Sequence, residues 1–172
     1  VVDNVNGKIH VPVGTSYRTF FEDVLVNGDA ANSDSLFTDN SFTALQTGTI
    51  KAGNVFAPMS ANGETLKYYE ITNDPFVGDV LVNDAPVTNL TDGAFKATAN
   101  VKNLKSGTVM MVIAQYKGNQ MVQAAVSAAL SKDGALEAQM DVSDAANSKV
   151  KIMFVDSLGN VMPYGSAVTV NP

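Results

Sequence analysis

The sequence predicts a mainly β protein in two parts, a small α+β unit followed by a two-sheet β sandwich. Three observations support this fold class. Two hairpin patterns lie between residues 108 and 164, where long apolar runs flank short polar turns that contain glycine. Residues 16–25 form the best candidate for a helix. The turn signal Asn73-Asp74-Pro75 places a domain boundary between residues 1–74 and residues 75–172.

The N-terminal unit is predicted to have the order β-α-β-β-β. Residues 8–13 alternate weakly between apolar and polar, and Pro12 restricts them to a strand end or an edge strand. Thr15 or Ser16 can cap the helix that follows. The apolar residues of this helix recur on one face, and they are Tyr17, Phe20, Phe21, Val24 and Leu25.

The later strands of this unit follow a polar stretch. Residues 29–41 are rich in turn-forming residues and therefore predict a loop. Residues 41–45 and 49–55 predict two short strands. A hairpin over residues 55–71 follows, closed by the turn-forming pair Asn62-Gly63.

The C-terminal unit is predicted to be β throughout. Residues 134–142 alternate cleanly between apolar and polar, which is typical of a strand with one face in water. Residues 124–130 are alanine-rich, but a strand is favoured over a helix because the run continues a hairpin. Short strands separated by regular turn signals indicate an immunoglobulin-like or fibronectin-III-like sandwich. The expected strands are residues 79–83, 86–88, 94–101, 108–116, 120–130, 134–142, 149–155 and 160–170.

Three segments carry a resemblance to known proteins. They are GTIKAGNVFAPMSANGETLKYYEI, LKSGTVMMVIAQYKGNQMVQAAVSAAL and SKVKIMFVDSLGNVMPYG. The first segment resembles a recurrent segment of bacterial surface proteins. The other two resemble the immunoglobulin-like accessory modules that end many Firmicutes cell-surface and glycan-processing proteins. The turn at residues 154–163 matches that pattern, except that its usual tryptophan is absent. The resemblance implies an extracellular or cell-wall-associated module of a Gram-positive bacterium, a class that includes spacers, stalks and accessory domains.

Composition excludes several functions. The net charge of -6 argues against a nucleic-acid partner, because phosphate binding requires clustered Lys and Arg. The absence of cysteine excludes a disulfide framework and a thiol nucleophile. Apolar runs are shorter than the ~20 residues needed to cross a bilayer, so no membrane insertion is expected. The first residues lack the features of a signal peptide, and we expect that an exported parent protein has its signal outside this chain.

Catalysis is not expected from these residues. His10 is the single histidine, and no G-x-S-x-G motif accompanies it, so a strand histidine is the simpler interpretation. Glu22 and Asp23 fall on the polar face of the predicted helix, as ordinary solvated charges do. We therefore predict a protein that is not an enzyme, with no catalytic or cofactor-binding residues.

Two sets of residues are candidates for binding. The polar loop supplies oxygen ligands for calcium at Asp29, Asn32, Asp34 and Asp39, although their spacing differs from that of an EF-hand. Carbohydrate binding uses exposed aromatic side chains. The chain has no tryptophan, so the candidates are the tyrosines Tyr68, Tyr69, Tyr116 and Tyr164. The alternatives are a plain surface loop and tyrosines that pack at sheet rims.

Three functions remain open. The first is a non-catalytic extracellular module that acts as a spacer, presents a neighbouring domain or binds another surface protein. The second is a carbohydrate-binding accessory module of a glycan-degrading enzyme, with a cell-wall or host glycan as its partner. The third is a self-associating adhesion or surface-layer subunit.

Overall fold

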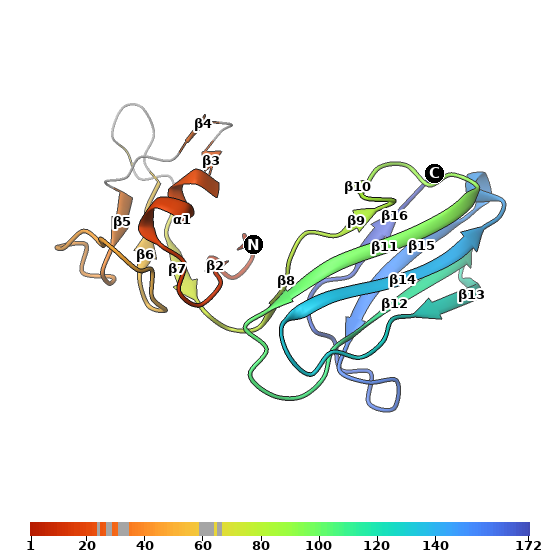
Figure 1. Ribbon diagram of the computed structural model, residues 1–172. Coiled ribbons are helices and arrows are strands. Elements are labelled where there is room, and N and C mark those ends of the chain that lie inside the picture. Colours follow the sequence, from red (N-terminus) through yellow and green to blue (C-terminus); the bar gives the residue numbers. More distant parts are fainter. Residues whose placement is uncertain (24, 27–28, 31–34, 59–63, 65–66) are drawn as a thin grey trace. The chain divides into compact units, whose positions relative to one another are not determined.

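The structure is a computed structural model that describes residues 1–23, 25–26, 29–30, 35–58, 64 and 67–172 (Figure 1). Strands hold 45% of the chain and helices 7%, so the prediction of a mainly β protein is confirmed. The chain divides into two compact units, Val1–Asp74 and Pro75–Pro172. Within the described ranges, no helix is long and apolar enough to cross a membrane.

The N-terminal unit is built on a five-stranded sheet. Its spatial order is β1-β2-β7-β6-β5, in which β2 and β7 are parallel and the other neighbours are antiparallel. A separate antiparallel pair, β3 and β4, follows the helix α1 (Figure 1). The bounds are β1 Val2–Asp3, β2 Lys8–His10, α1 Tyr17–Asp23, β3 Leu25–Val26, β4 Asp29–Ala30, β5 Leu36–Phe37, β6 Val55–Phe56 and β7 Tyr69–Thr72.

The helix α1 forms where the sequence predicts it but is shorter. The Ser16 hydroxyl accepts a hydrogen bond from the Thr19 backbone N–H at 3.1 Å, which supports the first turn. The ring of Phe20 packs edge-on against Phe56 of the sheet, with centroids 5.5 Å apart. Leu25 was predicted to be helical, and it pairs with Ala30 in β3 and β4 instead, because strand pairing outweighs the apolar periodicity. Val24 lies outside the described residues.

Several predicted strands of this unit are wrong. Residues 41–45 form no strand, and Leu45 makes only an isolated bridge to Phe37. Residues 49–55 are interrupted by a turn around Gly53, so the strand β6 starts only at Val55. The strand β5 lies inside the segment predicted to be a loop, where its pairing with β6 outweighs its polar flanks. The strands β6 and β7 pair as predicted, and the turn Asn62-Gly63 lies outside the described residues.

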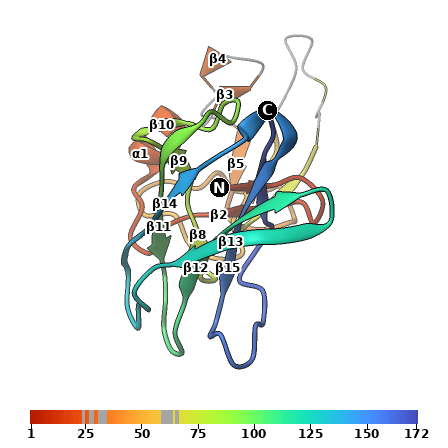
Figure 2. The same ribbon diagram turned by 90° about the vertical axis from the view of Figure 1, so that its right-hand side faces the viewer.

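The C-terminal unit contains two antiparallel sheets. The first has the order β10-β9-β11-β14, with β8 also paired to β11, and the second has the order β13-β12-β15-β16 (Figures 1 and 2). The bounds are β8 Phe76–Val77, β9 Leu81–Val82, β10 Ala85–Pro86, β11 Gly93–Lys102, β12 Met110–Lys117, β13 Gln120–Val126, β14 Gly134–Val142, β15 Lys149–Val155 and β16 Val168–Val170, with a short 3-10 helix, η2, at Ala145–Asn147.

The two sheets of this unit share one apolar core. Leu136 of the first sheet and Ile113 and Ile152 of the second belong to the same buried cluster. Along β14 the burial alternates as predicted, because Leu136 and Ala138 are buried whereas Glu137 is exposed. Apolar side chains alternating toward one core explain why both sheets form together.

The first predicted hairpin is confirmed and the second is only partly formed. The strands β12 and β13 are joined by the turn Gly118-Asn119, where Gly118 has a positive φ of 58°. The strand β13 ends at Val126, short of the predicted residue 130. Of the predicted strand 160–170, only residues 168–170 form a strand. The Asp156 carboxylate accepts a hydrogen bond from the Met162 N–H at 2.9 Å, which holds residues 156–162 in a loop.

His10 in β2 predicts a pH effect on stability. Burial of the imidazole, followed by the charge of the N-terminal amine, lowers the pKa of His10 from its ordinary 6.5. The unfolded chain therefore binds more protons just below pH 6.5, and the free energy of unfolding should fall as the pH falls through this window. Urea unfolding at several pH values between about 7 and 5 measures this slope. The dependence of the free energy of unfolding on pH should become weaker in His10→Gln. An unchanged dependence would show that other titrating groups cause it.

Candidate functional site

The candidate site lies on the face of the N-terminal sheet that is turned away from the core. Lys8, Glu70, Val55 and Phe37 are cross-strand neighbours in one row over β2, β7, β6 and β5. The neighbouring residues Ile9, Ile71, Phe56 and Leu36 belong to the buried cluster beneath α1. Because successive side chains of a strand point to opposite faces, the row faces away from this cluster.

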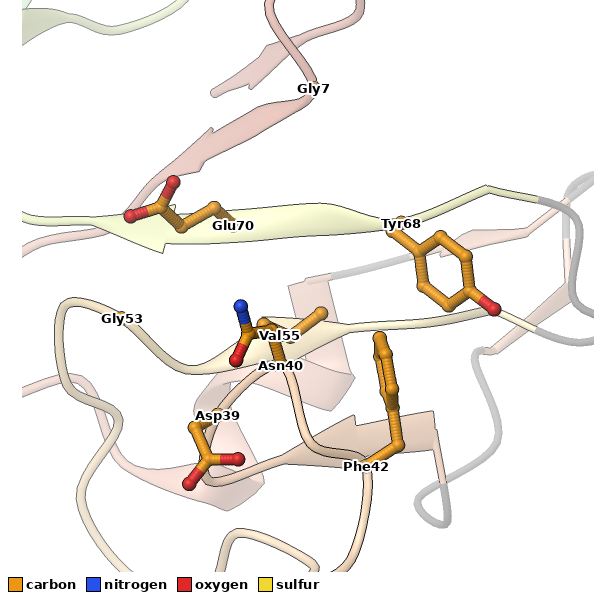
Figure 3. A pocket seen from close by; sticks show the side chains of 8 residues that line it. All are labelled: Gly7, Asp39, Asn40, Phe42, Gly53, Val55, Tyr68 and Glu70. Atoms are coloured by element: carbon orange, nitrogen blue, oxygen red, sulfur yellow. The ribbon is translucent and has the colours of Figure 1, made fainter.

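A hollow of about 630 Å³ opens over this row. Figure 3 shows aromatic, polar and glycine residues around it. Its volume falls in the range of roughly 300–1,000 Å³ that is usual for small-molecule sites. We call it the groove, and it is lined by Gly7, Asp39, Asn40, Phe42, Gly53, Val55, Tyr68 and Glu70.

Two aromatic rings form one side of the groove. The ring centroids of Phe42 and Tyr68 are 4.8 Å apart and the planes are tilted by 42° (Figure 3). Phe37 packs edge-on against Phe42 at 5.4 Å, so the pair is supported from the sheet. Phe42 is nevertheless 39% exposed and Tyr68 is 54% exposed. The rings therefore present apolar surface to whatever enters the groove.

A tight turn positions Phe42. The Asp39 carboxylate accepts the Ser41 N–H at 2.8 Å, and the Asp39 carbonyl accepts the Phe42 N–H at 3.4 Å. Phe42 has a φ of 57°, a left-handed conformation that costs a non-glycine residue about 1–2 kcal/mol. The rest of the fold must offset this strain. Strain of this kind is frequent at functional sites. Five other described non-glycine residues, among them Val161, also have a positive φ, so the exposure of the Phe42 ring and its contact with Tyr68 are what mark this position.

Apart from Val55, the remaining side chains of the groove are polar or acidic. Hydrogen bonds from the hydroxyl and then the backbone of Ser41 lower the pKa of Asp39, so this carboxylate stays ionised at neutral pH. Glu70 is exposed, and its carboxylate forms no ion pair within the described ranges. Asn40 adds an amide to the same lining (Figure 3). Together these groups offer acceptors to O–H or N–H donors of a ligand.

The predicted site residues divide between the groove and other places. Tyr68 and Asp39 come together in the groove, although they were predicted for different ligands. Tyr69 points to the other face of β7, where its hydroxyl donates to the Asn4 side chain at 2.8 Å. Tyr116 lies in β12 beneath the Lys151 ammonium, and Tyr164 packs half-buried against the C-terminal core, where burial raises its pKa. The four tyrosines therefore do not form one platform.

The predicted calcium loop falls largely outside what the structure describes. Asn32, Asp34 and the side chain of Asp29 lie outside what the structure describes. Asp39 is described, and its carboxylate supports the turn before Phe42. Among the described residues, no group of three or more His, Cys, Asp or Glu side chains gathers at one point. Calcium binding stays a prediction.

Sequence reasoning missed Phe42, Glu70 and Asn40 as groove residues. Glu70 carried a usable signal, because it lies two positions after Tyr68 and so shares its face of the strand. Phe42 carried none, since an isolated aromatic residue in a polar stretch does not reveal its partner. No family model matches the chain, and no significant match was found among curated proteins or solved structures.

Proposed function

We propose that the chain is a non-catalytic extracellular module of a bacterial surface protein, and that its N-terminal unit binds a saccharide. The observation that carries this proposal is the exposed Phe42–Tyr68 pair beside Asp39, Asn40 and Glu70 in a single groove. A glycan partner in the cell wall or on a host surface fits this chemistry.

The groove combines the two kinds of contact that a sugar ring requires. The C–H face of a pyranose is apolar and packs on an aromatic ring. Its hydroxyl groups donate hydrogen bonds, and ionised carboxylates are strong acceptors for them. Apolar walls with a few polar groups are typical of small-ligand sites. Tyr68 and Phe42 supply the first kind of contact, and Asp39 and Glu70 supply the second.

We propose an immunoglobulin-like sandwich for the C-terminal unit. The order β9-β11-β14 in one sheet and β13-β12-β15-β16 in the other corresponds to strands A-B-E and C′-C-F-G of that fold. The resemblance of residues 154–163 to modules of Gram-positive surface proteins supports the same assignment and an extracellular or cell-wall location. In this arrangement the C-terminal unit acts as a spacer that presents the N-terminal unit.

Self-association is a second candidate function. The strand β13 lies at the edge of its sheet and exposes Met121, Val122 and Val126. An edge strand with exposed apolar residues can pair with another chain. The net charge of -6 opposes the association of identical copies, so we favour the saccharide proposal.

Removal of an aromatic ring should test the proposal directly. A glycan array first identifies a glycan that the chain binds. Tyr68→Ala should then weaken the affinity for that glycan by about tenfold or more, which is about 1.4 kcal/mol. The physical reason is the loss of ring contacts with the sugar. Phe42→Asn should also weaken the affinity. Asparagine is chosen because it tolerates the left-handed backbone at this position.

Isothermal titration calorimetry with the identified glycan measures both variants. Tyr116→Ala is the matched control, because it removes a tyrosine from the C-terminal unit. It should leave the affinity unchanged. Absence of binding to every glycan on the array, or full affinity in Tyr68→Ala, would contradict saccharide binding in the groove and favour a pure spacer.

A further inference from the structure

We infer that the groove is selective for uncharged glycans over acidic ones, and that Glu70 determines this selectivity. The inference rests on the proposed saccharide binding and names the class of glycan. It is carried by the charges that line the groove and by the absence of cations among the described residues that line it.

Glu70 stands where a bound sugar would meet it. It lies on β7 between Lys8 of β2 and Val55 of β6, on the face that forms the groove. Tyr68, two residues earlier, lines the same groove, but its ring extends toward Phe42 whereas the Glu70 side chain extends the other way along β7 (Figure 3). Glu70 is exposed, and its carboxylate lies at the end of the groove farther from the Tyr68 ring (Figure 3). A saccharide that packs on Tyr68 and extends along β7 therefore reaches the Glu70 carboxylate with a more distant part of the molecule.

No positive charge of the lining neutralises this carboxylate. The eight lining residues include Asp39 and Glu70 and contain no Lys, Arg or His. Lys8 is the cross-strand neighbour of Glu70, but the two side chains form no ion pair within the part of the chain that the structure describes. Lys67 is turned to the other side, where its ammonium donates to the Asn4 carbonyl and lies 5.0 Å from the Tyr69 ring centroid.

The charge of a ligand should therefore decide whether it binds. The carboxylate of a uronic acid or a sulfate group would meet the like charges of Asp39 and Glu70 along the groove, and like charges repel. A neutral sugar brings hydroxyl donors to the same two carboxylates and forms charge-assisted hydrogen bonds. The groove thus accepts the neutral form of a sugar and rejects the acidic form.

A matched pair of ligands tests this selectivity. An array with neutral, uronic-acid and sulfated glycans first identifies the ligands that the full chain binds. Each neutral ligand with primary hydroxyls is then compared with its C6-oxidised form, in which those hydroxyls have become carboxylates. We expect the oxidised form to bind about tenfold or more weakly at low salt, and higher salt should narrow this difference because it screens the repulsion.

The variant Glu70→Gln isolates the role of this residue. Glutamine keeps the size of the side chain and an acceptor oxygen but removes the charge. The ratio of the affinity for the neutral ligand to the affinity for its oxidised form should fall by about fivefold or more, because part of the charge repulsion is removed. Glu137→Gln is the matched control, because it removes one exposed carboxylate from β14 in the C-terminal unit and should leave the ratio unchanged.

The outcomes separate this inference from the proposal beneath it. Binding of acidic glycans as strongly as neutral ones, or an unchanged ratio in Glu70→Gln, would overturn the selectivity while leaving saccharide binding intact. An equal change in Glu137→Gln would assign the effect to net charge and overturn the role of Glu70. Absence of binding to any glycan would instead overturn the proposed function itself.

Discussion

Replacing Gln115 by alanine is expected to lower the free energy of unfolding of the C-terminal unit by about 3 kcal/mol. Gln115 is fully buried in β12. Its amide donates to the Ser143 carbonyl at 2.6 Å and contacts the Ser148 hydroxyl at 2.8 Å, and its oxygen accepts from the Gln123 amide at 2.6 Å. Alanine leaves these groups without their partner and leaves a cavity, and both effects destabilise the folded state.

Two further variants separate the causes of this loss. Gln115→Leu fills the space but cannot make the hydrogen bonds. If it lowers the free energy of unfolding as much as Gln115→Ala does, the loss is due to the hydrogen-bond network. Gln139→Ala on the exposed side of β14 is the control and should change stability by less than about 0.5 kcal/mol. Native-state hydrogen exchange of the β12 amides measures the free energy of unfolding. A loss below about 1 kcal/mol in Gln115→Ala would show that the network contributes little.

Replacing Ile152 by alanine should have an effect of similar size, about 3–4 kcal/mol. Ile152 is fully buried in β15, between its cross-strand neighbours Ile113 and Val168. Removal of three carbon atoms loses apolar burial and leaves a cavity that a packed sheet interface cannot close.

A graded series makes this second prediction sharper. Ile152→Val removes one methyl group and should cost about 1 kcal/mol. Val126→Ala on the edge strand β13 should cost less, because Val126 is already 47% exposed. Urea unfolding followed by hydrogen exchange in β15 measures the series. Equal losses in Ile152→Ala and Val126→Ala would contradict a core centred on Ile152.

Local patterns in the sequence predicted the parts of the fold that depend on near neighbours. The hairpin of β12 and β13 was predictable because Gly118-Asn119 is a short turn between two apolar runs. The alternating burial of β14 was predictable because a strand has a period of two residues. The strand β5 and the parallel pair β2 and β7 were not predictable, because their pairing depends on partners distant in the chain.

In the groove, too, some features were predictable from local sequence and others depend on distant segments. Adjacent tyrosines in a strand must point to opposite faces, so the sequence alone indicated that one of Tyr68 and Tyr69 would be available. It could not indicate which one, because the register of β7 against β2 and β6 decides which face is buried under α1. Phe42 joins the groove from a turn far from Tyr68 in the chain.

By itself, the sequence determined the mainly β class, the confirmed hairpin and the alternating strand, because each follows from spacing within a few residues. The tertiary structure alone decided which side chains meet in the groove. The pairing of β7 places Glu70 beside Val55, and the turn after Asp39 brings the Phe42 ring onto Tyr68. Such meetings depend on the packing of segments distant in the chain, which no local pattern encodes.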